Sequence, residues 1–176
     1  MPAKPDIIGN LSMDATWWRR AAQEAIRRYC GWHVAPNITE TLNIDSYGGR
    51  TLLLPSKHVT DVASVIADDN DVTDQCDWSE SGVITLRNGQ WPDRPRGVKV
   101  TLSHGWNPEE VPDVQQLILQ LARRARSMPG NGMIQSQTVN GASVGYFSAG
   151  GGPLSLQLLQ IEKEALAPYR LEWSPR

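Results

Sequence analysis

Residues 25–36, AIRRYCGWHVAP, most constrain the fold of this chain, because the spacing of apolar residues changes there from that of a helix to that of a strand. Upstream, apolar and aromatic side chains recur every three or four residues, which predicts an amphipathic helix over about 14–30. Asp14 is suited to the N-cap of this helix and Gly31 to its C-cap. We therefore interpret the run as a joint between a helix and a β structure.

A small β unit is predicted over about residues 37–105. Residues 38–45 and 98–104 alternate between apolar and polar side chains, as half-buried strands do. Shorter apolar runs lie between them and are separated by turn-rich stretches. The short connections favour a mainly antiparallel arrangement.

Two further helices and a long loop are predicted after the β unit. Helical spacing returns at about 112–128 and at about 154–167. Between them, about residues 129–152 are rich in glycine, and no Asp, Glu, Lys or Arg occurs from 127 to 161. Long loops in compact domains are usually functional or disordered. We expect this loop and the C-terminal tail, 169–176, to become ordered on docking.

The order of these elements predicts an α+β fold. Three main helices form a scaffold, a small, mainly antiparallel β unit is inserted after the first, and a long Gly-rich loop precedes the last. With 176 residues, of which 40% are apolar, the chain can bury a substantial core. We expect a single domain over 1–176.

Composition excludes several classes of protein. A formal net charge of -2 and a pI near 5.9 argue against a basic groove that holds nucleic acid through its phosphates. The N-terminal sequence lacks the apolar run of a signal peptide, and no apolar stretch reaches the length of a membrane span. Two cysteines are too few for a disulfide framework, so we expect free thiols in a reducing compartment.

A metal site is not expected, although Cys30 and His33 have the C-x-x-H spacing of half a zinc site. A closed zinc site needs about four ligands at compatible spacings, and this run offers two. The other candidate ligands stand singly along predicted strands: His58, Cys76 and His104.

No catalytic or cofactor site is expected either. Asp69, Asp71 and Asp74 supply oxygen ligands, but the stretch lacks the glycine and glutamate of an EF-hand, so only a weak surface cation site stays open. The sequence GASVG at 141–145 matches G-x-S-x-G, but it lies within the predicted Gly-rich loop and not between a predicted strand and a helix, and the chain contains no phosphate-binding G-x-x-x-x-G-K-[ST] loop. These observations argue against hydrolysis of esters, peptides or nucleotides.

Several local strings occur in order over about residues 18–171. They are RRYCGWHVAP at 27–36, TETL at 39–42, LLLPS at 52–56, HVTDV at 58–62, VTLSHGW at 100–106 and LAPYRL at 166–171. With the order of the elements, they resemble the head-to-tail adaptor, or connector, proteins of long-tailed double-stranded DNA phages, particularly phages that infect actinobacteria.

The resemblance implies a non-enzymatic virion protein, made in the host cytoplasm, that forms a ring beneath the portal at the capsid vertex. Such rings commonly have twelve subunits, extend the DNA channel and offer a platform to the next neck protein, a head-closure (stopper) or tail component. The implied partners are other copies of the chain, the portal and that neck protein. DNA would only pass through the channel, and neither a cofactor nor a membrane is implied.

Charge along the chain indicates how such a ring could be held together. Residues 1–36 carry a net charge of +2 and residues 37–105 a net charge of -4. A cyclic ring joins two different faces of the subunit, so the basic helix and the acidic β unit are expected to attract each other. The candidate subunit or portal contacts are Trp17, Trp18, Arg19, Arg20, Arg27, Arg28, Tyr169, Arg170 and Trp173. The candidate channel-facing acids are Asp68, Asp69, Asp71 and Asp74.

Three alternatives remain open at this point. A head-closure or tail-completion protein of the same neck could share a small β core. A small metal-dependent hydrolase would use Cys30 and His33 as ligands. A generic host β module acquired for binding would associate with no portal.

Overall fold

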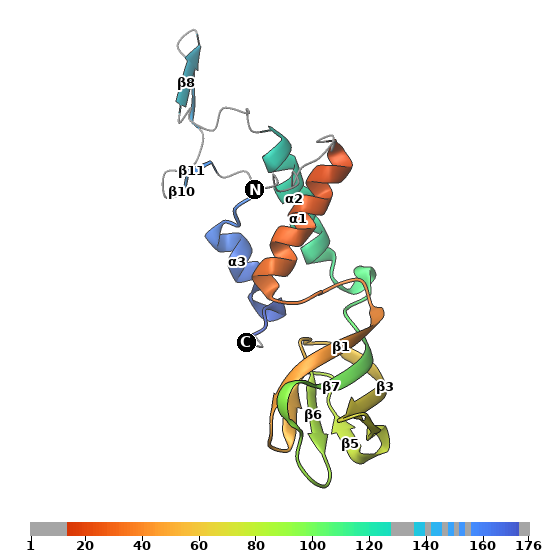
Figure 1. Cartoon of the computed structure of the whole chain (residues 1–176). Helices are drawn as coiled ribbons and strands as arrows, with labels where there is room; N and C mark the ends of the chain where they lie inside the picture. The colour runs from red at the N-terminus through yellow and green to blue at the C-terminus, as the bar shows by residue number, and fades with distance from the viewer. Residues whose placement is uncertain are drawn as a thin grey trace, which may run out of the picture. The chain divides into compact units, whose positions relative to one another are not determined.

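The computed structural model describes residues 14–127 and 156–172, together with the backbone of four short strands between 136 and 153 (Figure 1). The chain divides into two compact units. Unit 1 contains residues 1–26 and 116–160, and unit 2 contains residues 27–115 and 161–176. The described residues form three α-helices and several antiparallel sheets, so the protein is α+β, as the sequence predicts.

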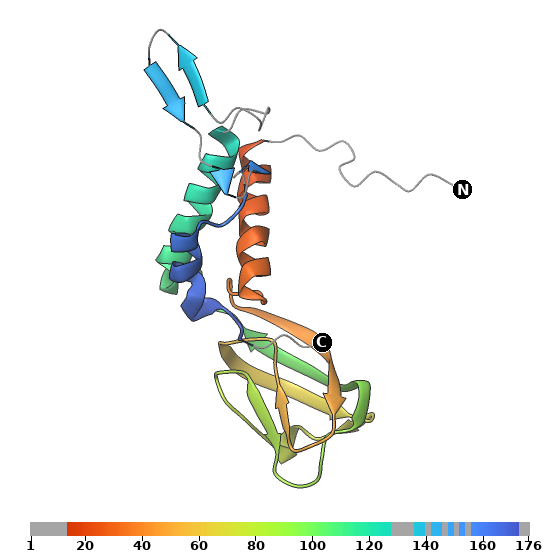
Figure 2. The ribbon, with the colours of Figure 1, turned by 90° about the vertical axis from the view of Figure 1, so that its left-hand side faces the viewer.

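Unit 1 contains most of helices α1 (Ala15–Cys30) and α2 (Pro112–Ser127), which lie side by side in Figures 1 and 2. The carboxylate of Asp14 accepts a hydrogen bond of 2.8 Å from the backbone N–H of Trp17, which confirms the predicted N-cap. Each helix buries one face, as its apolar spacing requires. The buried side chains of the unit are Ala22, Ile26, Leu121, Ala122 and Ala125.

The larger sheet of unit 2 has the strand order β1-β7-β3-β4, and all neighbours are antiparallel. Its strands are β1 (Ile38–Tyr47), β3 (Val59–Ala67), β4 (Asn70–Asp71) and β7 (Asp93–His104). The register of β1 and β7 runs from the pair Ile38 and His104 to the pair Tyr47 and Asp93. The His104 end of β7 therefore lies beside the start of β1, and the Asp93 end lies beside the end of β1.

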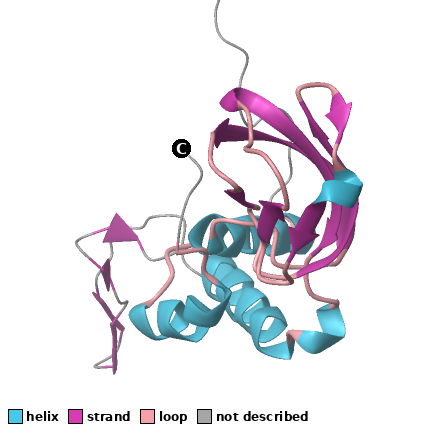
Figure 3. Ribbon diagram, turned by 90° about the horizontal axis from the view of Figure 1, so that it is seen from below, coloured by secondary structure: helices cyan, strands magenta, loops and turns pink. Residues whose placement is uncertain are grey.

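The smaller sheet of unit 2 has the order β2-β6-β5, formed by β2 (Thr51–Leu53), β5 (Cys76–Trp78) and β6 (Val83–Leu86). The 3-10 turns η1 (Thr73–Gln75) and η2 (Pro108–Glu110) precede β5 and α2. Figure 3 shows the strands of this unit as curved ribbons, and their buried side chains form one cluster. The core residues are Ile44, Leu52, Leu54, Val59, Val65, Cys76, Ile84, Leu86, Trp91, Val98, Val100 and Leu102.

The C-terminal third differs in detail from the predicted pattern. Within the stretch expected as one long loop, the structure describes two short antiparallel pairs of strands. These are β8 (Ser136–Val139) with β9 (Ala142–Gly145), and β10 (Ser148–Ala149) with β11 (Gly152–Pro153). The remainder of that loop lies outside the described residues.

Helix α3 (Gln160–Leu166) is shorter than the expected 154–167 and is followed by the 3-10 turn η3 (Ala167–Tyr169). It buries Glu162 and Leu166 and leaves Ile161 72% exposed, although Ile161 belongs to the apolar series from which the helix was predicted. That series began at Leu154, whereas residues 157–159 are not helical. No helix in the described part of the chain is long and apolar enough to cross a membrane.

Candidate functional site

The run 27–36 forms a tightly bonded joint in unit 2. Gly31 has a φ of +80° and donates its N–H to the Arg27 carbonyl at 2.8 Å, which confirms the predicted C-cap of α1. The Arg27 guanidinium donates through Nε to the His33 carbonyl at 3.1 Å and through Nη2 to the Ala35 carbonyl at 2.8 Å. Arg27 therefore stabilises the turn that follows its own helix.

The chain approaches itself closely at this joint. Val34, only 2% exposed, has a φ of +66°, which is unusual for a β-branched residue. Its carbonyl accepts the N–H of Trp106 at 2.8 Å. Gly105 has a φ of +102°, and a Cβ there would lie 2.6 Å from the Pro36 carbonyl oxygen. Only glycine at 105 permits this approach.

The segment after α3 is bonded to the same joint. Trp32, which is 6% exposed, donates its indole N–H to the Tyr169 carbonyl at 2.6 Å. The backbone N–H of Leu171 donates to the Cys30 carbonyl at 2.8 Å. These bonds fix the last described residues of the chain to the end of α1.

Two predicted contact residues make further bonds inside unit 2. The Tyr169 hydroxyl donates to the carboxylate of Asp113 at 2.9 and 3.0 Å, and burial together with that carboxylate raises the pKa of Tyr169 to about 12. The Arg170 guanidinium lies 5.6 Å from the ring centre of Tyr29. Tyr29 in turn donates its hydroxyl to the Lys163 carbonyl at 3.2 Å.

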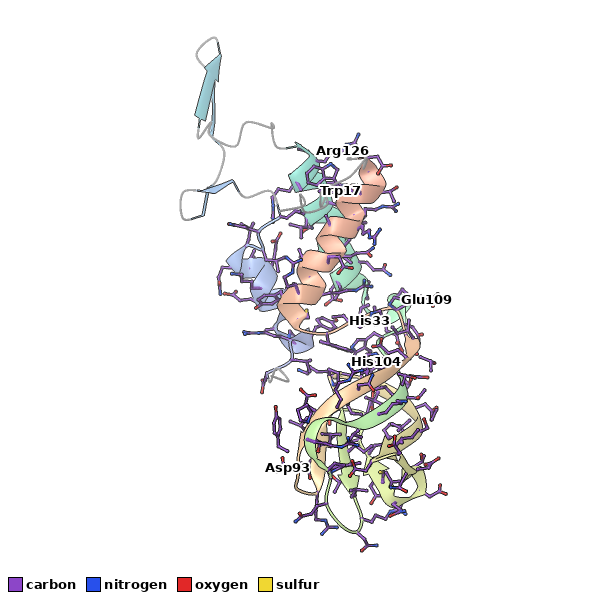
Figure 4. The ribbon with its side chains drawn as sticks, in the orientation of Figure 1. Trp17, His33, Asp93, His104, Glu109 and Arg126 are labelled. Carbon is purple, nitrogen blue, oxygen red and sulfur yellow. The ribbon has the colours of Figure 1, made fainter. Side chains whose placement is uncertain are left out.

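A pair of histidines lies at the joint, and sequence reasoning did not find it. His104, 1% exposed, has its Nε2 2.9 Å from a carboxylate oxygen of Glu40, and its ring centre is 5.7 Å from that of His33 (Figure 4). His33 donates its Nε2–H to the Pro36 carbonyl. Burial lowers the pKa of His33, and the charge of Arg27 acts in the same direction. His33 and His104 are 71 positions apart along the chain, so only the fold brings their rings together.

The C-x-x-H spacing is not used in the manner of a zinc site. Cys30 is fully buried, and burial raises the pKa of its thiol to about 11, whereas zinc binds the thiolate. Over residues 14–127 and 156–172, no group of three or more His, Cys, Asp or Glu side chains is arranged to hold a metal ion. His58 lies elsewhere in unit 2, stacked on Trp106 with ring centres 3.8 Å apart, and its Nδ1 is 2.7 Å from Glu80.

We group as the cationic patch six residues of unit 1 that lie near the start of α1 and near the end of α2: Trp17, Trp18, Arg19, Arg20, Arg123 and Arg126. The two tryptophan rings meet edge to face, with centres 4.7 Å apart, and both are half-buried. The four arginines are exposed, and Figure 4 shows Arg126 and Trp17 at the same end of the α1 and α2 pair. The described residues of unit 1 include five arginines and two carboxylates, a net charge of +3.

Unit 2 is acidic, with ten basic and sixteen acidic side chains among its described residues, a net charge of -6. At one end of its larger sheet, Asp68 is bonded to Arg94 at 2.6 Å. Asp71 accepts the N–H and the hydroxyl of Thr73, and these bonds lower the pKa of Asp71. The fold thus brings an arginine of β7 to this run of acids, although Arg94 lies 26 positions after Asp68.

The remaining predicted contact residues have simple positions. Arg28 is exposed in the part of α1 that belongs to unit 2. Asp69 and Asp74 are exposed at the acidic turn. Trp173 lies outside the described residues.

Comparison with known proteins defines the fold but not a sequence family. No family model matches the chain, and no curated protein matches it. One similar solved chain comes from the neck of a native GTA particle computed with C12 symmetry, at 16% identity and a TM-score of 0.57, covering 94% of this chain and 88% of that one. Another comes from the neck of an empty GTA particle computed with C6 symmetry, at 16% identity and a TM-score of 0.55, covering 99% and 88%. The chain therefore shares the fold of chains from particle necks.

Proposed function

We propose that the protein is a structural subunit of the neck of a phage-type particle and that it assembles into a ring. The observation that carries this proposal is the likeness to a chain of the GTA neck, which covers 94% of this chain and 88% of the other. Similarity over nearly both lengths includes the helices as well as the β unit. The C12 and C6 symmetry of those necks supports a ring.

In finer detail, the proposed ring has twelve subunits, lies beneath the portal and extends the DNA channel. The resemblance of the local strings to phage adaptor proteins supports this position. A net charge of -2 suits a channel that DNA passes through without being bound, since tight DNA binding relies on cationic contacts with phosphates. Of the four acids predicted to face the channel, Asp68, Asp69 and Asp71 are assigned below to a contact between subunits, and Asp74 stays a candidate for the channel wall.

A role in assembly also agrees with the chemistry of the joint. The thiol of Cys30 is buried and protonated at neutral pH, so it is poorly suited to the metal-dependent hydrolase alternative. The bonds of Trp32 and Leu171 hold the C-terminal segment to the joint, and the tail beyond it is our candidate for the portal contact. Arg27, Tyr169 and Arg170 bond within unit 2, and a portal contact through them stays a prediction.

Electron microscopy of the full-length protein, alone and mixed with the portal of the same particle, tests the proposal. We expect rings with twelvefold symmetry that bind coaxially to the portal. A head-closure protein would bind the portal only after another neck protein had bound. Failure of the chain to form rings or to bind a portal under any of these conditions would overturn the proposed function.

A further inference from the structure

We propose that each ring contact joins the cationic patch of one copy to the acidic end of unit 2 in the next copy. We define the acidic end as Tyr47, Asp68, Asp69, Asp71 and Asp93. The proposal rests on the proposed function, because it specifies how the ring is held together. It names a second copy of this chain as the partner of the patch.

The cationic patch has the composition of a protein contact. Arg19, Arg20, Arg123 and Arg126 are exposed, and no ion pair to them is found in the part of the chain that the structure describes. The described part of unit 1 holds two acids, Asp14, which is engaged as the cap of α1, and Glu24, which lies four positions after Arg20. Tryptophan and arginine are the residue types that contribute most binding energy at interfaces.

The acidic end offers a complementary surface. Tyr47 is 73% exposed, the largest exposed fraction among the large apolar side chains described, and it lies directly opposite Asp93 in the register of β1 and β7. Asp69 and Asp93 are exposed, and no cation is bonded to either among the described residues. The bond from Arg94 to Asp68 holds the β3–β4 turn beside the start of β7. Tyr47 therefore lies opposite one carboxylate, Asp93, and the other three acids lie in or beside the β3–β4 turn, which Arg94 reaches from β7.

Two physical arguments favour a second copy over other occupants. A ring requires two different faces on every subunit that fit each other, and this chain carries one face of each sign. The net charges of +3 and -6 on the described parts of the two units make the attraction reciprocal. An exposed tyrosine also suits a contact that excludes water better than a channel wall. For these reasons we assign the acidic end to the neighbouring subunit rather than to the channel.

Charge exchange provides the test. One variant reverses the patch (R19E, R20E, R123E and R126E), a second reverses the acidic end (D69K and D93K), and a third carries all six changes. A control variant changes two exposed acids elsewhere in unit 2 (E109K and E172K). Circular dichroism checks folding, and light scattering and electron microscopy follow ring formation, with portal added where the wild type needs it.

We expect each of the first two variants to associate with itself at least about tenfold more weakly than the wild type. Mixing these two variants should restore rings of alternating copies, because every contact between unlike copies is either doubly reversed or unchanged and is therefore attractive. The six-change variant should form rings again, and the control should behave as the wild type does.

Normal rings from both single-face variants would overturn this inference and leave the neck function standing. Absence of rings from the wild type itself would instead overturn the proposed function. A third result, loss of affinity for duplex DNA in the patch variant with unchanged rings, would make the patch a nucleic-acid site and reject the contact proposed here.

Discussion

Replacement of Gly105 by alanine should destabilise the protein by forcing apart two backbone segments at the joint. The new Cβ would lie 2.6 Å from the Pro36 carbonyl oxygen and 3.2 Å from Cδ2 of His33. The Gly105 N–H also donates to the His58 carbonyl at 2.8 Å, and its carbonyl accepts a bond of 3.1 Å from Asn37, so the glycine cannot shift freely.

Two costs contribute to the expected effect. A φ of +102° is unfavourable for alanine, by about 1–2 kcal/mol. The steric overlap adds about 1–3 kcal/mol, the usual cost of overpacking. Gly89 provides a matched control, because it has a φ of +85° and no atom within 4 Å of an added Cβ. Gly89→Ala therefore carries the first cost without the second, and both variants share the change in unfolded-state entropy.

The assay is urea and thermal unfolding of Gly105→Ala and Gly89→Ala, followed by tryptophan fluorescence and by far-ultraviolet circular dichroism. We expect Gly105→Ala to be less stable than Gly89→Ala by about 1–3 kcal/mol, which corresponds to roughly 2–12 °C in the midpoint of a chain of this size. A difference below about 0.5 kcal/mol, the range of ordinary surface substitutions, would refute the reasoning.

Three further predictions concern the same joint. Trp32→Phe removes the donor to the Tyr169 carbonyl and should cost about 1–3 kcal/mol in thermal unfolding, whereas an unchanged midpoint would show that the bond contributes nothing. The Tyr169 phenol should ionise near pH 12 in absorbance titrations, and Asp113→Asn should lower that midpoint. The phenol keeps its proton to a higher pH in the folded protein than in the unfolded chain. The free energy of unfolding should therefore fall as the pH rises above about 10. His33 has a lowered pKa, so the unfolded chain takes up the proton first, and stability should fall as the pH drops below about 6.5. His33→Gln removes this group and should reduce the dependence of stability on pH, while the neighbouring Arg27, His104 and Glu40 stay in place. A pH profile identical to that of the wild type would contradict the prediction.

Local features of the fold could be predicted because they depend on residues a few positions apart. The cap at Asp14 and the stop at Gly31 are set by one side chain and one glycine, and both occur in the structure. Strand β1 (Ile38–Tyr47) likewise lies where apolar and polar residues alternate.

Prediction was weaker where glycine and proline separate short elements. The apolar residues from Leu154 onward predicted one helix over about 154–167, but α3 starts at Gln160 and buries Glu162 instead of Ile161. Regularly spaced apolar residues share one face of a helix only if the whole stretch that contains them is helical. The two pairs of short strands between 136 and 153 carry no strong alternation by which they could be recognised.

The candidate site shows the same division between local and distant information. Arginines were predicted as contacts from their charge and helical position, and Arg19 and Arg20 are indeed exposed. Arg27 has the same charge and lies on the same helix, yet its guanidinium bonds to the carbonyls of His33 and Ala35. Charge alone does not distinguish an arginine that is available for a partner from one that stabilises its own turn.

The sequence by itself determined that a helix changes to a β unit near residue 30 and that the protein is α+β, because helix caps and side-chain periodicity are local properties. Only the tertiary structure decided which charges and rings meet. Arg94 reaches Asp68 across 26 positions, and Trp32 reaches Tyr169 across 137. Such contacts depend on strand register and on the closure of long loops, and neither is encoded in the spacing of neighbouring residues.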